Sequence, residues 1–426
     1  MLTVRRVTMP QDRLGNEFAP DVPYARGRIL TNAADDLVKV AAAQRHMRSL
    51  RDAGKPVYLL SGLERRLDAH ADDIPMMDDE LAGAFYGEQL RERGLEHLGG
   101  DPARHDVILT NRLTAALLVA ADVMIQPGDV VLGVSPRYSH PAVARAVAHG
   151  GGVFHDCAGV AAFRRELESR EKVDLVFITR LAVSYEILDL KDLQTVVNLA
   201  AERGLRTIVD DAGGARVGPA VFEQPRTLEL GVTVGATGLD KYGTTGPRVG
   251  LLGGDHELIA RMRIRAFEMG LEARQMLYPA VVRSIEGYSA QKVRDRVAAT
   301  QGVADALKTR ISANRLFETP VTVQLRAEDI LELAQERAGV DSAPIVPYEA
   351  TAALAMLMLR DHGIMTVHFA GIPPGTSAMM IKFLSPEILQ ELGGAERFAE
   401  ALDQSLDSLA GMLGDEASLR SLILGH

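Results

Sequence analysis

The stretch VGATGLDKYGTTGPRVGLLGG, residues 234–254, contains a single lysine, Lys241, between two glycine-rich segments. Small residues on both sides allow another molecule to approach the amine closely. A lysine amine withdrawn from water loses its proton more readily and becomes a nucleophile towards an aldehyde. The alternative is a lysine on a solvated loop, where most lysines lie. The glycine-rich surroundings favour the nucleophile.

Two acids, Asp210 and Asp211, precede Lys241 by about thirty residues and end the apolar run of TIVDDAGGARVG, residues 207–218. An acid at the carboxyl end of a buried strand needs a cationic partner. A protonated pyridine-type nitrogen would be such a partner, and the acid would keep that ring electron-withdrawing. Either acid could instead cap a turn, and this motif alone leaves both interpretations open.

Two further motifs follow short apolar runs. In VSPRYSHPAV (134–143), His140 could lie against a flat ring, although a helix-capping histidine is the interpretation we favour for this motif in isolation. In TNRLTAALL (110–118), a helix start beside Arg112 and Thr114 could bind an anion such as phosphate. Plain helix capping by Asn111 explains the same letters.

These residues require elements that bring them together. From about residue 105, short apolar segments alternate with helical ones. We expect strands at 106–110, 130–135, 152–157, 173–179, 205–211, 231–238 and 248–254, and helices at 112–125, 141–151 and 190–204. This alternation predicts an α/β fold of three layers (αβα), in which helices cover both faces of a mostly parallel sheet. Ligands of such sheets bind at the carboxyl ends of the strands.

The rest of the chain predicts two flanking parts. Residues 1–55 read as an extended arm followed by a helix at 35–54, and residues 56–287 as the large domain. A long helix at 288–310 connects to a smaller α/β domain that completes residues 288–426.

Composition narrows the class of protein. The 426 residues carry a net charge of −10, which argues against a nucleic-acid partner. A single cysteine, Cys157, excludes an intrachain disulfide and a cysteine-based zinc site. We expect a cytoplasmic protein without membrane contact, because no signal-peptide core or run of eighteen apolar residues occurs. The acidic segment 72–80 reads as a solvated loop, and we expect no metal.

The motifs together resemble those of fold-type I pyridoxal-phosphate enzymes, within the group similar to bacterial selenocysteine synthase (L-seryl-tRNA selenium transferase). The resemblance covers residues 100 to 260 well and the C-terminal part in outline. TGLDKYGTTGPRVG resembles the segment that carries the cofactor-bound lysine, here Lys241, and the strand-ending acid resembles the pyridinium partner, here Asp210. YSHP is similar to the segment that stacks on the pyridine ring, which implicates His140.

The resemblance also implies the remaining cofactor contacts. NRLTAA occupies the first phosphate-cup position, which suggests Arg112, Leu113 and Thr114. Thr244, Thr245 and Gly246 resemble loop residues that reach the phosphate of a neighbouring subunit, so a homodimer or larger homo-oligomer with shared sites is implied.

Two departures from the family pattern stand out. Gly213 lies where a His or Gln is common, so that side chain's contact with cofactor or substrate is missing. The stretch PPGTSAMMIKFLSP (373–386) offers Lys382 where an Arg often grips the substrate carboxylate. Lys382, Arg180 or Arg112 could take this group, or it is held loosely because the reaction removes it. His368 is a further substrate-pocket candidate, although a core histidine explains it better.

The resemblance implies an enzyme that forms an aldimine with an α-amino acid and stabilises a Cα carbanion. We expect lyase or group-transfer chemistry. An oxygenase-decarboxylase that uses dioxygen, on an amino acid that could be linked to a nucleoside, is the alternative, and the missing arginine favours it. True selenocysteine synthase activity does not suit an acidic chain, because it needs a tRNA partner. A non-catalytic binding protein on a degenerate version of this fold is a third possibility, against which Lys241 and Asp210 argue.

Overall fold

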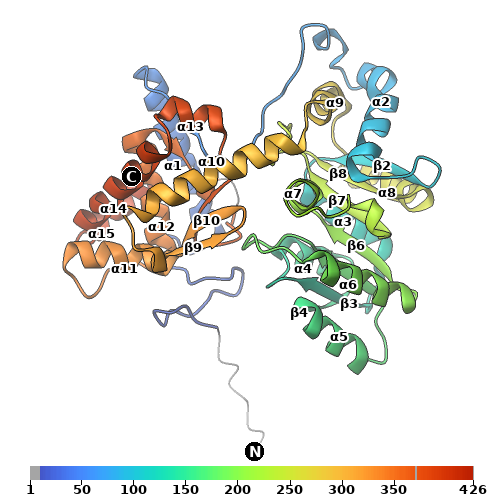
Figure 1. Ribbon diagram of the computed structural model, residues 1–426, viewed down its shortest axis with the longest axis horizontal. Coiled ribbons are helices and arrows are strands. Elements are labelled where there is room, and N and C mark those ends of the chain that lie inside the picture. Colours follow the sequence, from blue (N-terminus) through green and yellow to red (C-terminus); the bar gives the residue numbers. More distant parts are fainter. Residues whose placement is uncertain (1–9, 370–371, 426) are drawn as a thin grey trace, which may run out of the picture. The chain divides into compact units, whose positions relative to one another are not determined.

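The chain forms two compact units in the computed structural model, which describes residues 10–369 and 372–425 (Figure 1). The large unit spans Leu63–Arg294, and the small unit combines residues up to Gly62 with Asp295–His426. The units begin at 63 and 295, where the sequence suggested 56 and 288, a difference of seven residues in each case. The N-terminal segment clusters with the C-terminal residues rather than forming a part of its own.

The large unit is built on a seven-stranded sheet with the strand order β2-β8-β7-β6-β5-β3-β4. Strand β8 runs antiparallel to both of its neighbours, and every other neighbouring pair is parallel. The strands are β2 (His105–Thr110), β3 (Val130–Ser135), β4 (Val153–Ala158), β5 (Leu175–Thr179), β6 (Arg206–Asp210), β7 (Val234–Gly238) and β8 (Gly250–Asp255).

Helices cover both faces of this sheet, because its central strands are apolar on both sides. The core of one face contains side chains from α3, α4 and α8, and the core of the other contains side chains from α2, α5, α6 and α9. The helices of the large unit are α2 (Leu81–Leu98), α3 (Leu113–Met124), α4 (Pro141–His149), α5 (Gly159–Ser169), α6 (Leu190–Glu202), α7 (Gly214–Val221), α8 (His256–Glu268) and α9 (Tyr278–Glu286).

The predicted α/β class with a mostly parallel sheet is confirmed. Each strand expected between residues 105 and 255 is present, with ends that differ by at most three residues. The sequence analysis did not specify α2, α5, α7, α8 or α9. The segment of α7 reads GARVGPAV, and its two glycines and one proline disguise a helix at the sequence level.

The small unit packs helices on a three-stranded antiparallel sheet with the order β12-β10-β9. A separate parallel pair in the same unit joins β1 (Tyr58–Leu59) and β11 (Ile364–Met365). The strands are β9 (Leu316–Thr319), β10 (Thr322–Leu325) and β12 (Met379–Lys382). The helices are α1 (Ala33–Asp52), α10 (Ala290–Lys308, which the unit boundary crosses), α11 (Ala327–Ala338), α12 (Pro347–His362), α13 (Pro386–Leu392), α14 (Ala395–Met412) and α15 (Glu416–Leu424).

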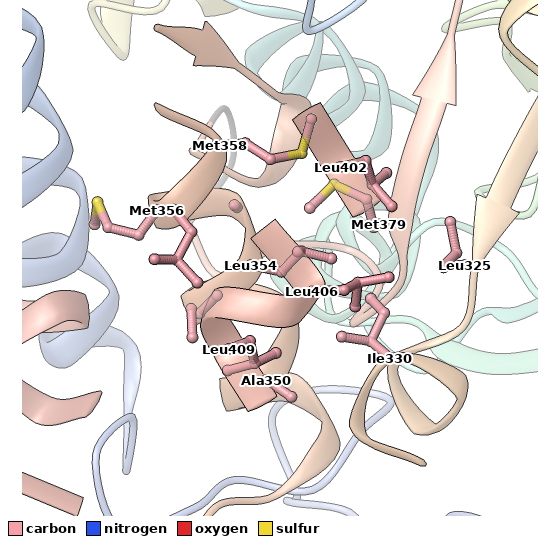
Figure 2. Packing of buried hydrophobic residues seen from close by; sticks show 14 of the residues in the cluster. Leu325, Ile330, Ala350, Leu354, Met356, Met358, Met379, Leu402, Leu406 and Leu409 are labelled. Carbon is pink, nitrogen blue, oxygen red and sulfur yellow. The ribbon is translucent and has the colours of Figure 1, made fainter. Parts of the chain in front are cut away.

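The core of the small unit centres on α12, which is buried from Pro347 to Leu359. Figure 2 shows Leu354, Met356 and Met358 of this helix among leucines of α14 and side chains of the sheet. A helix that is apolar all round is a core element rather than a surface one.

The small unit also buries a polar network around Lys39 of α1. The Nζ atom of Lys39 donates to Asp36 Oδ1 at 3.0 Å and to the Tyr348 hydroxyl at 2.8 Å, and lies 3.4 Å from His368 Nε2. Arg26 donates to the other carboxylate oxygen of Asp36 at 3.2 Å. Every one of these side chains is fully or almost fully buried, so the lysine charge is matched by partners inside the unit.

The acidic segment 72–80 is tied down by ion pairs. Asp73 accepts hydrogen bonds from Arg283 and from the Tyr86 hydroxyl, and Asp79 pairs with Arg274. Within residues 10–369 and 372–425, no three or more His, Cys, Asp or Glu side chains gather as metal ligands do. None of the helices described combines the length and apolar character needed to cross a membrane.

Candidate functional site

Asp210 and Lys241 lie at the carboxyl ends of two neighbouring parallel strands. Asp210 is the last residue of β6 and is paired with Ala236 of β7, and Lys241 follows the end of β7 by three residues. Asp210 is 3% exposed, and burial raises the pKa of its carboxyl to about 6 although the nearby Lys241 charge lowers it. Burial lowers the pKa of the half-buried Lys241, and Asp240 and Asp210 oppose that shift.

The amine of Lys241 makes no hydrogen bond or ion pair with any residue that the structure describes; its nearest recorded contact is with the ring of Tyr242, whose centroid lies 5.6 Å away. Such an amine is poised to lose its proton and to react.

The second acid of the pair, Asp211, points to the opposite face of the sheet, because successive side chains of a strand alternate. There its Oδ2 atom accepts from Arg180 at 2.8 Å and from the Thr227 hydroxyl at 2.6 Å. Arg180 is fully buried and also donates to the carbonyl of Pro225. Arg180 is therefore a structural partner of Asp211, and its suggested role as a carboxylate ligand stays a prediction that this pairing does not favour.

Two buried hydroxyls continue the row of Asp210 across the strand ends. Thr179, the last residue of β5, is paired with Asp210, and Ser135 is the last residue of β3. Both hydroxyls are buried and lack a hydrogen-bond partner among the described residues. A buried polar atom without a partner is rare in native proteins and is explained well by a ligand. Sequence analysis missed these residues, because the absence of a partner is visible only in three dimensions.

His140 caps helix α4 and also faces Lys241. Its Nδ1 atom accepts from the backbone N–H of Ala142 at 3.0 Å, which leaves the proton of the neutral ring on Nε2. Burial, together with the charges of Lys241 and Arg145, lowers the pKa of His140 to about 4. The capping interpretation is thus correct, and the ring is a neutral group near the lysine.

Helix α3 begins without a side-chain cap. Arg112 occupies the N-cap position and makes no side-chain capping bond, and the amide of Asn111 donates instead to the carbonyl of Gly270. The first N–H groups of a helix, here those beginning at Leu113 and Thr114, lack intrahelical acceptors. Capping by Asn111 is therefore wrong, and the helix start can receive an anion.

Arginines around this helix start outnumber the acids. Arg65 pairs with Asp240 at 2.9 Å, and Arg248 lies 3.8 Å from the same carboxylate oxygen. Burial and the charges of Arg65 and Arg112 lower the pKa of Arg248 to about 10, although Asp240 opposes this. Three guanidinium groups that repel one another around one carboxylate form an electropositive site. Sequence analysis missed Arg248, although it lies seven residues after Lys241 in a glycine-proline loop.

The loop after Lys241 packs against residues of its own chain. The Thr244 hydroxyl donates to the carbonyl of Lys241 at 2.8 Å, and the side chain is fully buried. The backbone of Thr245 bonds Ser284 and Arg66, and a side chain at Gly246 would clash with the Arg66 carbonyl at 2.6 Å. Thr244 is thus used inside the loop, whereas the Thr245 hydroxyl is buried without a partner among the described residues.

Arg216 of α7 joins the two loops that carry Asp210 and Lys241. Its guanidinium donates to the carbonyl of Ala212 at 3.2 Å and to that of Gly238 at 2.6 Å. Arg216 is fully buried, forms no ion pair with any residue described, and contributes to the lowered pKa of Lys241. It therefore fixes the spacing of the two strand ends and acts on the lysine electrostatically.

The two remaining candidates belong to the small unit. His368 is buried beside Lys39 and Tyr348, and burial lowers its pKa well below the usual range, as a core histidine requires. Lys382 is buried at the end of β12, with its backbone opposite Thr322 of β10. Contact of either residue with a substrate stays a prediction.

Comparisons with known proteins found chains of similar sequence and structures of similar fold. The chain is 27% identical over 376 residues to a "UPF0425 pyridoxal phosphate-dependent protein" of Methanothermobacter thermautotrophicus, covering 87% of this chain and 92% of that protein. A protein of the same description from Methanosphaera stadtmanae is 26% identical over 319 residues, or 74% and 79% of the two chains. No protein-family model matches the chain.

Among solved structures, aspartate aminotransferase from Thermotoga maritima superposes with a TM-score of 0.54 at 18% identity, covering 85% of this chain and 96% of that one. The aspartate aminotransferase of Thermus thermophilus with maleate gives 0.55 at 19% identity. The fold of the chain is therefore the aminotransferase-like, fold-type I arrangement that the sequence predicted.

Proposed function

We propose that the chain is a pyridoxal-phosphate-dependent enzyme acting on an α-amino acid. One observation carries the proposal. The amine of Lys241, which has no hydrogen-bond partner among the described residues, and the buried carboxylate of Asp210 lie at adjacent strand ends, within each other's electrostatic reach. The names of the curated relatives and the fold of the solved aminotransferases support the same cofactor.

The residues present suit each part of this cofactor. Lys241 would hold its aldehyde carbon, and Asp210 would pair with the ring nitrogen. The uncapped start of α3 at Arg112, Leu113 and Thr114, together with Arg248, would take the phosphate dianion, which matches the local excess of positive charge. The partnerless hydroxyls of Thr179 and Ser135 lie on the same row as Asp210 and offer further donors to a bound molecule.

When bound, the cofactor supplies an electron sink for a bond broken at the substrate Cα. The protein's part is to control protons and solvent around that atom. The Nζ atom of Lys241, with its lowered pKa, can take a proton from Cα and return one. Asp210 would pair with a protonated ring nitrogen of the cofactor, and the neutral ring of His140 would cover the face of the cofactor without adding charge.

For the reaction itself, we propose lyase or group-transfer chemistry. The segments around Lys241 and His140 that resemble the selenocysteine synthase group support this class. The oxidative alternative gains from the commitment of Arg180 to Asp211, because one candidate for holding the substrate carboxylate is removed. Product analysis with and without dioxygen separates the two: oxygen uptake with release of carbon dioxide indicates the oxidative reaction, and unchanged turnover without oxygen excludes it.

We further propose a homodimer as the smallest assembly. Several large apolar side chains of the large unit are exposed on elements that pack on one another, with Phe85 at 64% and Ile74 at 61%, and Leu81 and Met276 nearby on the same group of elements. A soluble chain covers such a set by association. One chain has a mass of 46.0 kDa, and sedimentation of the purified protein should give twice that mass.

The decisive experiment is an absorbance measurement. The chain supplied with pyridoxal phosphate and dialysed should show a band at the violet edge of the visible spectrum that borohydride removes, and mass spectrometry should place the reduced adduct on Lys241. A conservative Asp210→Asn variant should keep the adduct but lose most of its turnover. A colourless protein without an adduct would point to a non-catalytic binding protein and refute the proposal.

A further inference from the structure

The resemblance to fold-type I enzymes implies a His or Gln where this chain has Gly213, and side chains from elsewhere in the chain fill the space beside this glycine. A Cβ atom at Gly213 would lie 2.6 Å from Leu181 Cδ2 and 2.9 Å from Cε2 of the Tyr242 ring. Gly213 has φ −120°, a conformation open to any residue, so the backbone does not require glycine there. The space beside Gly213 does require glycine, because the side chain of Tyr242 occupies it.

Tyr242 is held in this place by Tyr185. The two hydroxyls are hydrogen-bonded, and the rings meet edge to face with centroids 6.3 Å apart. Both residues are buried, with 3% and 6% exposure. Tyr185 belongs to the turn after β5, and Tyr242 to the loop after β7, so the bond joins loops from two strand ends.

The backbone at both tyrosines is unusual. The described residues include four non-glycine residues with positive φ, and Tyr185 at 63° and Tyr242 at 57° are two of them. Left-handed backbone is costly for a bulky residue and persists where the surroundings impose it, commonly at functional sites. Two such residues that meet through their hydroxyls indicate a fixed geometry.

The ring so fixed faces the reactive amine. Lys241 Nζ lies 5.6 Å from the Tyr242 ring centroid, within the range of a cation–π contact. The charged groups that act on this amine are Asp210 from β6, Asp240 from its own loop, Arg216 from α7 and Arg65 from the segment before α2. The ring of His140 at the start of α4 is neutral, and its pKa is lowered by the Lys241 charge. In addition to these groups, the ring of Tyr242 presents an aromatic face to the amine. This contact favours the protonated form of the amine.

We propose that the Tyr185–Tyr242 pair is a positioning device that replaces the side chain absent at 213 and holds an aromatic face against the Lys241 amine. The role rests on the proposed function, because Lys241 is the lysine that would hold the cofactor. The ring favours the protonated amine and so offsets part of the lowering of the lysine pKa by burial. Tyr242 acts on the amine directly through its ring, and Tyr185 acts through Tyr242.

The test measures the ionisation of Lys241 in the full-length, cofactor-free chain. Reductive methylation with formaldehyde and cyanoborohydride, followed over pH and quantified on the Lys241 peptide by mass spectrometry, gives the midpoint. Tyr242→Leu, which removes the aromatic face but fills much of its volume, should lower the midpoint by about half a unit to one unit. Tyr185→Phe should lower it less, because the ring remains but loses its anchor.

Gly213→Ala gives an independent route to the same result, since the added methyl group would lie 2.6 Å from Leu181 Cδ2 and 2.9 Å from the Tyr242 ring and would crowd that ring without altering either tyrosine. The matched control is Tyr86→Phe, which also removes a hydrogen-bonded hydroxyl of the large unit, that to Asp73, and should leave the midpoint unchanged. Exposed Lys172 is an internal reference in every sample.

An unchanged midpoint in both Tyr242→Leu and Gly213→Ala, or a rise in either, would overturn the proposal, because the ring would then be only a space-filler. In the cofactor-loaded chain, the pH midpoint of the visible absorbance should also move in Tyr242→Leu. A shift in the cofactor-free chain without any visible band would support the tyrosine pair and refute the proposed function, so the two failures are distinguishable.

Discussion

The two units each bury a lysine, and the difference between the two lysines shows what distinguishes a reactive group from a structural one. Lys39 of the small unit and Lys241 of the large unit both have pKa values lowered by burial. Lys39 donates to Asp36 and Tyr348 and is fully enclosed. Lys241 has no such bond among the described residues and stays half-buried. Burial alone therefore does not mark a nucleophile; burial without partners does.

The surroundings repeat the same contrast. Around Lys39, the other buried polar groups bond one another. Around Lys241, within the described part of the chain, hydroxyls at two strand ends have no hydrogen-bond partner, the start of α3 has no side-chain cap, and arginines exceed acids. Around Lys39, the Nε atom of Arg26 is the exception, because it is buried without a hydrogen-bond partner among the described residues. The region around Lys241 leaves more of its polar groups available for a molecule that is not part of the chain.

Removing each lysine should therefore have opposite consequences. Lys241→Ala is expected to abolish the visible band with pyridoxal phosphate and to lower turnover by at least about 10³-fold, because both the attachment point and the base are lost. Its thermal unfolding should change little. If Lys241→Ala retains the visible band after dialysis, the contrast drawn between Lys241 and Lys39 is wrong.

Lys39→Met should leave the visible band intact and lower the free energy of unfolding by about 3 kcal/mol. The cost arises because Asp36 loses one buried cationic partner while Arg26 remains. Urea unfolding measures it. Lys172→Met, which removes an exposed lysine at 67% side-chain exposure, is the control and should change stability by less than about 0.5 kcal/mol.

The pH dependence of stability sharpens the contrast at Asp210. Burial raises the pKa of this carboxyl to about 6, so the folded chain keeps a proton that the unfolded chain releases near pH 4. The stability from that proton is complete below about pH 4 and is lost as pH rises through about 6. Asp210→Asn cannot titrate, so the wild-type unfolding free energy minus that of the variant should fall by up to about 3 kcal/mol across this interval.

Urea titrations of the cofactor-free wild type and variant between pH 4 and 7 give this difference. His140, with its pKa lowered to about 4, produces the opposite slope in both proteins and cancels from the comparison. Parallel stability curves would mean that Asp210 is ionised throughout, as an internally satisfied acid would be.

The smallest effect is expected for the excess of positive charge around the start of α3. Arg248→Gln should weaken the affinity for pyridoxal phosphate by about 10-fold, since one charge-assisted contact is lost and the others remain. Arg91→Gln, an arginine paired with Asp106 in the same unit, is the matched control and should not alter that affinity. Equal affinity of the Arg248 variant, measured by absorbance titration, would remove Arg248 from the phosphate site.

The sequence predicted the elements that follow simple periodicity and missed those that do not. The alternation from residue 105 onwards gave the strands and their order along the chain, whereas α7 was hidden by its glycines and proline. Lys241, Asp210 and His140 were found because they follow apolar runs, and their roles stay predictions. Arg180 was suggested because it also follows an apolar run, and its pairing with Asp211 was not foreseen. Which face it takes depends on its pairing with Asp211, and strand register is not visible in the sequence.

The acid doublet at 210 and 211 has a consequence for how β6 is aligned. If the strand shifted by one residue in one direction, Ala212 would replace Asp211 opposite Arg180. The buried guanidinium of Arg180 would then lose its ion-pair partner. A slide in the other direction would bring Val209 to the position of Asp210 and leave the lysine facing a hydrocarbon. Each of the two adjacent carboxylates interacts with a cation on its own side, so a register shift in either direction is destabilising. The same two interactions therefore specify both the register of β6 and the position of Asp210 next to Lys241.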